Sequence, residues 1–261
     1  MRFDRRDLPD DDWEHFLRAR DLAQLIEESP KPLQGPVLEV GCGDGFLTGL
    51  LRRRFEMVVP IDIRPRARVS GACVADAQTL PFRDNAFQLI FSSNVLEHVK
   101  DPTTCMAEMR RVLRDDGLMV HTMPTVTWKV AQLVLYPLHV LIHVAAPKAV
   151  GKLARHRQAV QTSSRTSPHS REAATVRRSR LRSLFMPPVH GAASSHRREL
   201  RCFRKRSWVE QFELSGLEVV KTSPMFLHSA YRFLPYRALD LRGTMSRFGL
   251  ASVRAYWVRK S

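Results

Sequence analysis

Bare backbone follows the first strongly apolar stretch of the sequence. Residues 37–45 read VLEVGCGDG, in which Gly41, Gly43 and Gly45 alternate directly after a strand-like run. Glycine opens backbone conformations that are closed to other residues and lets a ligand approach the main chain closely, at a cost in folding entropy. The spacing therefore predicts a loop that cradles a ligand, with a plain tight turn as the alternative.

An acidic residue follows at a suitable distance. Asp62 ends the next apolar stretch, 23 positions after Glu39. This is close to the offset of roughly 20 residues at which nucleotide-binding folds place an acid on a ribose. Charge-assisted hydrogen bonds of this kind are about twice as strong as neutral ones. The glycine spacing, GxGxG with Phe46 next, departs from the GxGxxG dinucleotide fingerprint.

These motifs together resemble those of class I S-adenosylmethionine (SAM) methyltransferases. Residues 39–45, EVGCGDG, look like motif I of that family. Residues 74–102 are similar to its segment that holds adenine and borders the methyl donor, and residues 109–124 resemble its helix, glycine turn and fifth strand. The resemblance is closest to the group that includes ubiquinone and menaquinone biosynthesis methyltransferases. It departs from the family pattern at Gln88, where members commonly carry Asp.

The resemblance implies that SAM is the cofactor and assigns roles to matching residues. Glu39 would engage the ammonium group of SAM directly or through water, and Asp62 would accept hydrogen bonds from the ribose. Asp76 would accept from the adenine amino group, and the backbone of Ala77 would meet a ring nitrogen. The full set of implied cofactor contacts is Glu39, Gly41, Cys42, Gly43, Gly45, Asp62, Ile63, Asp76, Ala77 and Asn94.

A catalytic base is needed only where the methyl acceptor arrives protonated. His98 follows Glu97 after the fourth apolar stretch, near the expected acceptor, and is the candidate base. The alternative is a histidine bonded to backbone, since catalytic motifs must be confirmed by geometry. His121 lies within a predicted strand and is interpreted as structural. No metal ligands are predicted, and the four cysteines show no CxxC spacing that would indicate a zinc knuckle or a disulfide framework.

The elements that must position these residues alternate between strands and helices. Strands are predicted over residues 37–41, 57–62, 72–75, 87–93 and 117–123, and helices over 10–28, 46–54 and from about 101. A helix from about 206, a glycine stop and two further strands, the last at 252–258, close the chain. Apolar strands between helices predict an α/β fold, a Rossmann-like, doubly wound, seven-stranded and mostly parallel sheet covered on both faces.

The regular alternation stops near Pro124 and resumes around Arg206. The sequence therefore predicts a SAM-binding domain made of residues 1–124 and 206–261, with residues 125–205 as a helical, basic insertion between strands 5 and 6. After the insertion, the aromatic stretch 224–250 lies between the last two strands, and its Tyr231, Phe233 and Tyr236 either line the acceptor pocket or pack as ordinary core.

The insertion begins with an uncharged stretch. Residues 130–147, VAQLVLYPLHVLIHVAAP, reach the lower edge of transmembrane length. Polar residues recur at helical spacing along one side, and a proline interrupts the stretch. We expect an amphipathic helix that covers the active-site mouth, enters a membrane interface, or does both, with an ordinary buried cap helix as the alternative. The polar residues are Lys129, Gln132, Tyr136, His139 and His143.

Most of the net charge also lies in the insertion. The whole chain carries a formal charge of +16, and residues 148–206 hold 16 Lys and Arg against Glu172 and Glu199, which gives +14. Basic residues beside an amphipathic helix suit anionic lipid headgroups, at about 1 kcal/mol each. The alternative is a solvated, arginine-rich and mobile linker.

Three functions are compatible with these features. The favoured one is SAM-dependent methylation of a hydrophobic, lipid-linked or envelope-related small molecule at a membrane surface. The second is RNA methylation through the basic segment, which is less expected because residues 148–206 contain only Phe185 and Phe203 as aromatic platforms. The third is a non-catalytic partner protein with the same fold. The first residues, MRFDRRDLPDDDWEHF, do not predict a secretory signal, so a cytoplasmic or inner-membrane-surface location is expected.

Overall fold

The computed structural model describes residues 13–65, 69–145, 186–225, 227 and 239–261. The described residues fall into two compact units. The first holds those of Met1–Lys129, Val189–His228 and Leu234–Ser261, and the second holds those of Val130–Pro188. The domain limits predicted at 124 and 206 stay a prediction.

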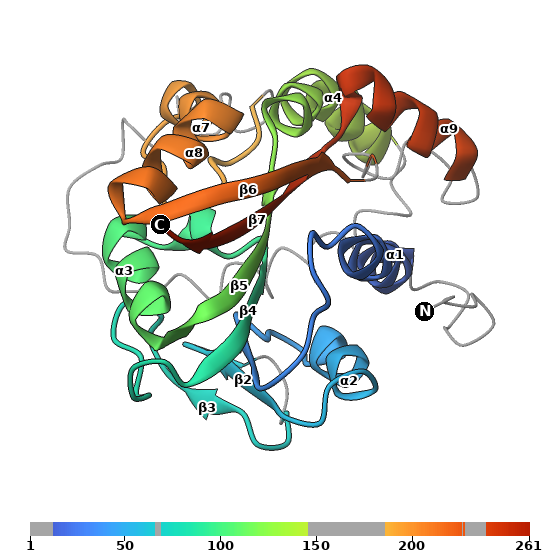
Figure 1. Ribbon diagram of the computed structural model, residues 1–261. Helices are drawn as coiled ribbons and strands as arrows, with labels where there is room; N and C mark the ends of the chain where they lie inside the picture. Colours follow the sequence, from blue (N-terminus) through green and yellow to red (C-terminus); the bar gives the residue numbers. More distant parts are fainter. Residues whose placement is uncertain (1–12, 66–68, 146–185, 226, 228–238) are drawn as a thin grey trace. The chain divides into compact units, whose positions relative to one another are not determined.

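A seven-stranded sheet forms the centre of the first unit (Figure 1). Its strand order is β3-β2-β1-β4-β5-β7-β6, in which β7 runs antiparallel to both of its neighbours and the other pairs are parallel. The Rossmann-like fold class predicted from the sequence is confirmed. The strands are β1 (Val37–Val40), β2 (Val58–Asp62), β3 (Cys73–Val74), β4 (Phe87–Ser93), β5 (Leu113–Pro124), β6 (Leu217–Pro224) and β7 (Val253–Lys260).

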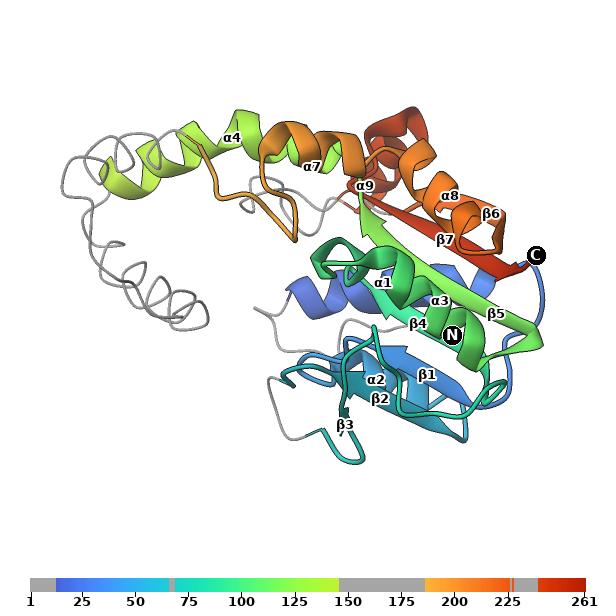
Figure 2. The same cartoon turned by 90° about the vertical axis from the view of Figure 1, so that its left-hand side faces the viewer.

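Helices cover both faces of this sheet (Figures 1 and 2). On one face, α1 (Trp13–Glu27) and α2 (Phe46–Arg52) pack against the sheet, and on the other face α3 (Pro102–Val112) and α8 (Lys205–Leu214) do so. Strand β1 shows that both faces of the sheet are buried. Its Leu38 packs in the core beneath α3 and α8, and its Val37 packs in the core beneath α1 and α2. Such two-sided burial explains the continuous apolar runs of the sequence.

The remaining described elements are short or lie outside the alternation of strands and helices. Two of them, α4 (Val126–Ala145) and α7 (His196–Cys202), fall in the segment that the sequence marked as an insertion. The turn η2 (Leu96–His98) follows β4, and α9 (Leu239–Met245) and η4 (Ser246–Leu250) lie between β6 and β7. No helix among the described residues is long and apolar enough to cross a membrane. Tyr231, Phe233, Tyr236 and most of the basic segment lie outside the described residues.

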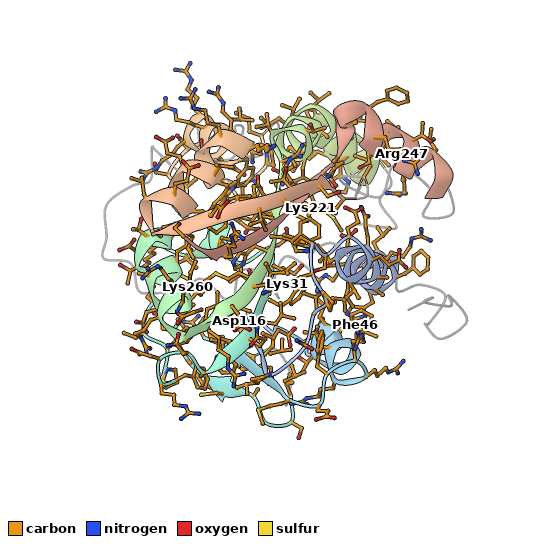
Figure 3. The ribbon with its side chains drawn as sticks, viewed as in Figure 1. Lys31, Phe46, Asp116, Lys221, Arg247 and Lys260 are labelled. Carbon is orange, nitrogen blue, oxygen red and sulfur yellow. The ribbon has the colours of Figure 1, made fainter. Side chains whose placement is uncertain are left out.

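Polar bonds fix the sheet near the amino ends of β4 and β5. The Lys31 ammonium donates to the backbone carbonyl of Asp116, and the Lys260 ammonium donates to Asp115 and Asn85 at 2.8 Å each (Figure 3). The carboxyl ends of the parallel strands, at the opposite edge, remain available for a ligand site.

Candidate functional site

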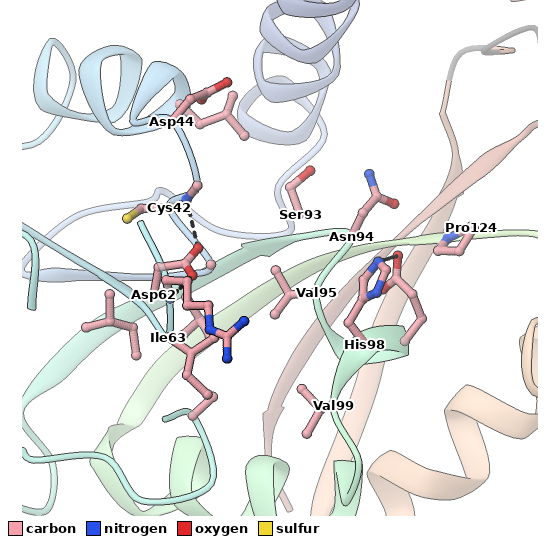
Figure 4. A pocket seen from close by; sticks show the side chains of 18 of the residues that line it. Cys42, Asp44, Asp62, Ile63, Ser93, Asn94, Val95, His98, Val99 and Pro124 are labelled. Carbon is pink, nitrogen blue, oxygen red and sulfur yellow. Dashed lines mark hydrogen bonds and ion pairs between the residues drawn. The ribbon is translucent and has the colours of Figure 1, made fainter. Parts of the chain in front are cut away.

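A cavity of about 850 Å³ lies at the carboxyl ends of β1, β2, β4 and β5, entirely within the first unit. Small-molecule sites usually occupy about 300–1,000 Å³. Figure 4 shows Cys42, Asp62 and Ile63 on one side, His98 and Pro124 on the other, and Ser93, Asn94 and Val95 between them. Of the predicted cofactor contacts, all but Glu39 and Gly45 line this cavity.

The glycine loop turns sharply at the end of β1. The backbone N–H groups of Gly41 and Cys42 both donate to the carbonyl oxygen of Ile61, at 2.8 and 3.0 Å. Gly41, Gly43 and Gly45 all have positive φ, which favours glycine. A Cβ at Gly41 would meet Val95 at 2.3 Å, whereas a Cβ at Gly43 would meet nothing within 4 Å. Gly43 therefore leaves its main chain open to a ligand in the cavity.

Asp62 is held so that part of its carboxylate faces the cavity. One oxygen accepts from the Gly43 backbone at 2.9 Å and the other from the Arg64 backbone at 2.8 Å. An ionised carboxylate offers about four acceptor positions, so each oxygen keeps capacity for one more donor. This geometry suits a pair of neighbouring hydroxyls.

Asp76 and Ile63 flank the same part of the cavity. The Asp76 carboxylate accepts from the backbone and side-chain amides of Gln78, at 2.9 and 3.2 Å, which fixes its direction. Ile63 is 62% exposed although it is apolar, so its side chain forms a surface that a flat ring of a ligand can contact. Together these residues suit a planar heterocycle with a donor group at its edge.

Glu39 lies behind the glycine loop instead of in the cavity lining. It is buried, and the Thr48 hydroxyl donates to its carboxylate at 2.5 Å. Burial raises the pKa of Glu39 from 4.5 to about 7, although the Thr48 hydrogen bond acts in the opposite direction. Any contact with a ligand from this position would pass through the loop or a bridging water.

Comparisons with known proteins agree with this geometry. Residues 38–121 match the family model described as a methyltransferase domain. This part of the chain is therefore similar to a methyltransferase domain, in agreement with the resemblance to class I SAM-dependent methyltransferases. The matched stretch runs from β1 into β5 and so includes the glycine loop, Asp62, Asp76 and η2.

Two relatives that are methyltransferases by name are similar to part of this chain. An uncharacterized methyltransferase of Mycobacterium sp. (strain KMS) is 41% identical over 108 residues, which cover 38% of this chain and 42% of that protein. The ubiquinone biosynthesis O-methyltransferase of Cereibacter sphaeroides is 30% identical over 105 residues, covering 35% and 42%. The chain thus spans less than half of these relatives, and the activity of the whole protein stays a proposal.

One solved structure shows how far the fold extends beyond that domain. The crystal structure of an S-adenosylmethionine dependent methyltransferase from Mesorhizobium loti has a TM-score of 0.52 and 13% identity, covering 92% of this chain and 97% of that one. At this identity the likeness shows the fold alone. It extends the methyltransferase fold beyond residues 38–121, to the sheet that β6 and β7 complete.

The far end of the methyltransferase cavity contains titratable and aromatic groups. His98, the predicted base, lines it, and its side chain is about half exposed. Glu97 lies beside it with only 1% of its side chain exposed. Asn94 turns the chain here with a φ of 52° while its N–H donates to the Thr122 carbonyl at 2.9 Å. This end therefore combines titratable side chains with apolar and aromatic ones.

Two residues of this end come from outside the motifs that the sequence identified. Trp128, in the first turn of α4, and His190, before α7, both line the cavity, with ring centroids 4.9 Å apart. The backbone N–H of His190 donates to Glu199 at 3.3 Å, and Glu199 pairs with Lys129 at 2.7 Å, both fully buried. For His190, the only signal in the sequence was a histidine that follows two prolines and precedes a glycine, inside a segment interpreted as a basic loop.

His121 plays the structural part that the sequence indicated. Its side chain is fully buried, and its Nδ1 lies 2.8 Å from the Ser92 hydroxyl. Burial lowers the pKa of His121 from 6.5 to about 3, so the ring stays neutral at ordinary pH. It does not line the cavity.

Proposed function

We propose that this protein transfers a methyl group from SAM to a hydrophobic or lipid-linked small molecule. The observation that carries the proposal is one cavity with two chemically distinct ends. One end has open main chain at Gly43 and a carboxylate at Asp62, and the other has the apolar surfaces of Val99, Trp128 and Val253.

The first end fits SAM in each of its parts. The main chain at Gly43 would meet the aminoacid portion, the free acceptor positions of Asp62 would take the ribose hydroxyls, and Asp76 would take the adenine amino group. SAM, once bound, supplies a methyl group on a positively charged sulfur that leaves readily. The protein mainly has to hold the acceptor in line with that methyl group, about 3 to 3.5 Å away.

The second end supports an apolar acceptor. Trp128 and Val253 offer carbon surface, and pockets lined in this way bury apolar ligands with a few polar groups fixing their orientation. A relative 30% identical over 105 residues is named a ubiquinone biosynthesis O-methyltransferase, and its name also points to a hydrophobic acceptor. His98 remains the proposed base for an acceptor that arrives protonated.

The outer face of α4 supports access to acceptors held in a membrane. Apolar residues recur at helical spacing along its exposed side, whereas Gln132 and Tyr136 on the other side are half-buried. A helix exposed to water alone would show the reverse pattern. The exposed apolar residues are Val130, Val134, Leu138, Leu141 and Ile142.

Binding calorimetry with SAM tests the cofactor end directly. Asp62→Ala should lower affinity by about 100-fold or more, because two charge-assisted hydrogen bonds contribute about 1.5–3 kcal/mol each. Gly43→Val should abolish binding, because the introduced valine side chain would enter the cavity.

A matched control separates obstruction from backbone strain. Gly249 also has positive φ and open space where a Cβ would lie, but it does not line the cavity. Gly249→Val should therefore keep wild-type SAM affinity. Wild-type affinity in both Asp62→Ala and Gly43→Val would refute this placement of the cofactor.

A further inference from the structure

Three potential metal ligands converge at the acceptor end of the cavity. They are Glu97 and His98 in η2 and His190 in the loop before α7. The Glu97 Oε1 lies 4.0 Å from His98 Nε2 and 3.9 Å from His190 Nε2. One ligand atom from each of the three residues lies within 4.8 Å of the other two. The three groups therefore surround one point.

The Glu97 carboxylate lacks the partners that a buried charge requires. Its side chain is 1% exposed, and neither oxygen finds a hydrogen-bond donor among the described residues. An unpaired buried charge is costly, so such groups in proteins are paired or coordinate a metal. Its own backbone carbonyl accepts from the Ala192 N–H at 2.8 Å, which ties η2 to the His190 loop.

The distances fit a shared cation better than direct hydrogen bonds. Hydrogen bonds between nitrogen and oxygen span about 2.7–3.2 Å, so separations of 3.9 and 4.0 Å are too long for them. Ligand atoms about 2.1 Å from one zinc ion are separated by about 3.0–3.4 Å, depending on geometry. Metal binding would therefore have to shorten the separations of Glu97 from the two histidines by about 0.5–1 Å.

We propose that Glu97, His98 and His190 bind one first-row divalent transition-metal ion, with Zn²⁺ as the representative case. Two histidines and a carboxylate form a ligand set of catalytic zinc sites, which keep a further position open. Mg²⁺ and Ca²⁺ prefer oxygen ligands and are disfavoured by two imidazoles. On the proposed function, on which this step rests, the open position selects acceptors with an oxygen donor next to the methylated atom. With the metal bound, His98 would serve as a ligand in place of a base, and the metal would lower the pKa of the bound acceptor group instead.

The surroundings hold the third ligand in place. The backbone N–H of His190 is bound by Glu199, which is itself paired with Lys129 in full burial. The His190 ring also contacts the His98 and Trp128 rings, with centroids 4.6 and 4.9 Å apart. Such outer contacts orient metal ligands and affect affinity by about 10–100-fold.

Metal binding by the full chain tests the proposal. Chelator-treated protein without a histidine tag should bind one Zn²⁺ in equilibrium dialysis, and bound Co²⁺ should give the visible absorption typical of nitrogen and oxygen ligands at low coordination number. Glu97→Gln and His190→Ala should each weaken Zn²⁺ binding by more than the roughly 10–100-fold that loss of an outer contact causes, since each removes or neutralises a ligand. Mg²⁺ should compete poorly.

Control measurements keep the result clear. His139→Ala, on α4 and outside the cluster, should bind Zn²⁺ as the wild type does. Calorimetry with SAM should show unchanged affinity in Glu97→Gln and His190→Ala, which verifies folding. The proposal is overturned by a wild type that binds no transition metal, or by variants that bind it equally well. SAM binding and methyl transfer are measured separately, so loss of the proposed function would not imitate either outcome.

Discussion

Protonation of Glu39 is linked to folding and, on the proposed function, also to cofactor binding. Its folded pKa is about 7 against an ordinary value of 4.5, so between these values the folded state binds more protons than the unfolded state. Stability then falls as pH rises from about 5 to 8, by an amount on the order of 3 kcal/mol. Glu39→Gln should remove this part of the pH dependence in denaturant unfolding.

Addition of SAM should change the pH dependence of stability that Glu39 causes. A positive ammonium group near Glu39 favours the carboxylate, so the fall in wild-type stability between pH 5 and pH 8 should be smaller with SAM than without it. Thr48→Val removes the hydrogen bond to Glu39 and should make the fall larger. Identical pH profiles in the wild type and Glu39→Gln would contradict the assignment.

Individual residues differ in how far the sequence could place them. Gly43 and Asp62 follow or end apolar strands, and neighbouring parallel strands bring such ends together, so both line the cavity, while their contact with SAM stays a prediction. His190 could not be predicted, because its approach to Glu97 depends on a tertiary contact between distant segments. Glu39 was assigned by resemblance, and its burial behind the loop was not evident from spacing.

At the scale of elements, apolar patterns predicted strands and helices, whereas charged and polar stretches left the start of β5 and the whole of α7 unpredicted. Strand β5 begins at Leu113, earlier than the predicted 117, because its exposed residues 114–116 carry charges and give no strand pattern. Helix α7 was not predicted, because its sequence HRRELRC looks like part of a basic loop. Ser195 caps it, and its Glu199 is buried with Lys129, a pairing that only the fold reveals.

The Lys129–Glu199 pair gives a prediction about α4 and α7. Lys129→Met leaves the Glu199 charge buried with its cationic partner removed, and should lower unfolding free energy by about 3–5 kcal/mol. The double variant Lys129→Met/Glu199→Leu should recover most of that loss, because apolar replacement of a whole buried pair is often nearly neutral.

Urea unfolding of the wild type, both single variants and the double variant measures the coupling between these residues. A matched control is the exposed pair of Arg259 and Glu218, 2.7 Å apart, whose single variants should change stability by less than about 1 kcal/mol. Losses in the double variant equal to the sum of the single losses would show that the buried pair does not couple the two helices.

For the whole molecule, the uneven distribution of charge and exposed apolar surface supports the proposed membrane partner over RNA. The sequence assigns +14 of the net +16 to residues 148–206, which follow α4 and its exposed apolar face along the chain. Lipid headgroups would attract the basic segment, and the boundary between headgroups and acyl chains would receive the apolar face of α4. RNA would bind the basic segment alone, so substitutions on α4 distinguish the two partner classes.

Vesicle flotation tests this separation. The double variant Val134→Asp/Leu141→Asp places charges at side chains that are 68% and 65% exposed, and should reduce flotation with anionic vesicles by about 100-fold or more, because burial of each apolar side chain contributes about 1.5–3 kcal/mol. The control Val74→Asp/Leu214→Asp adds the same charge at sites 71% and 77% exposed on β3 and α8, and should float as the wild type does. RNA retention on filters should be equal in both variants. Equal loss of flotation in both would assign the effect to net charge alone, and the membrane role of α4 would then be wrong.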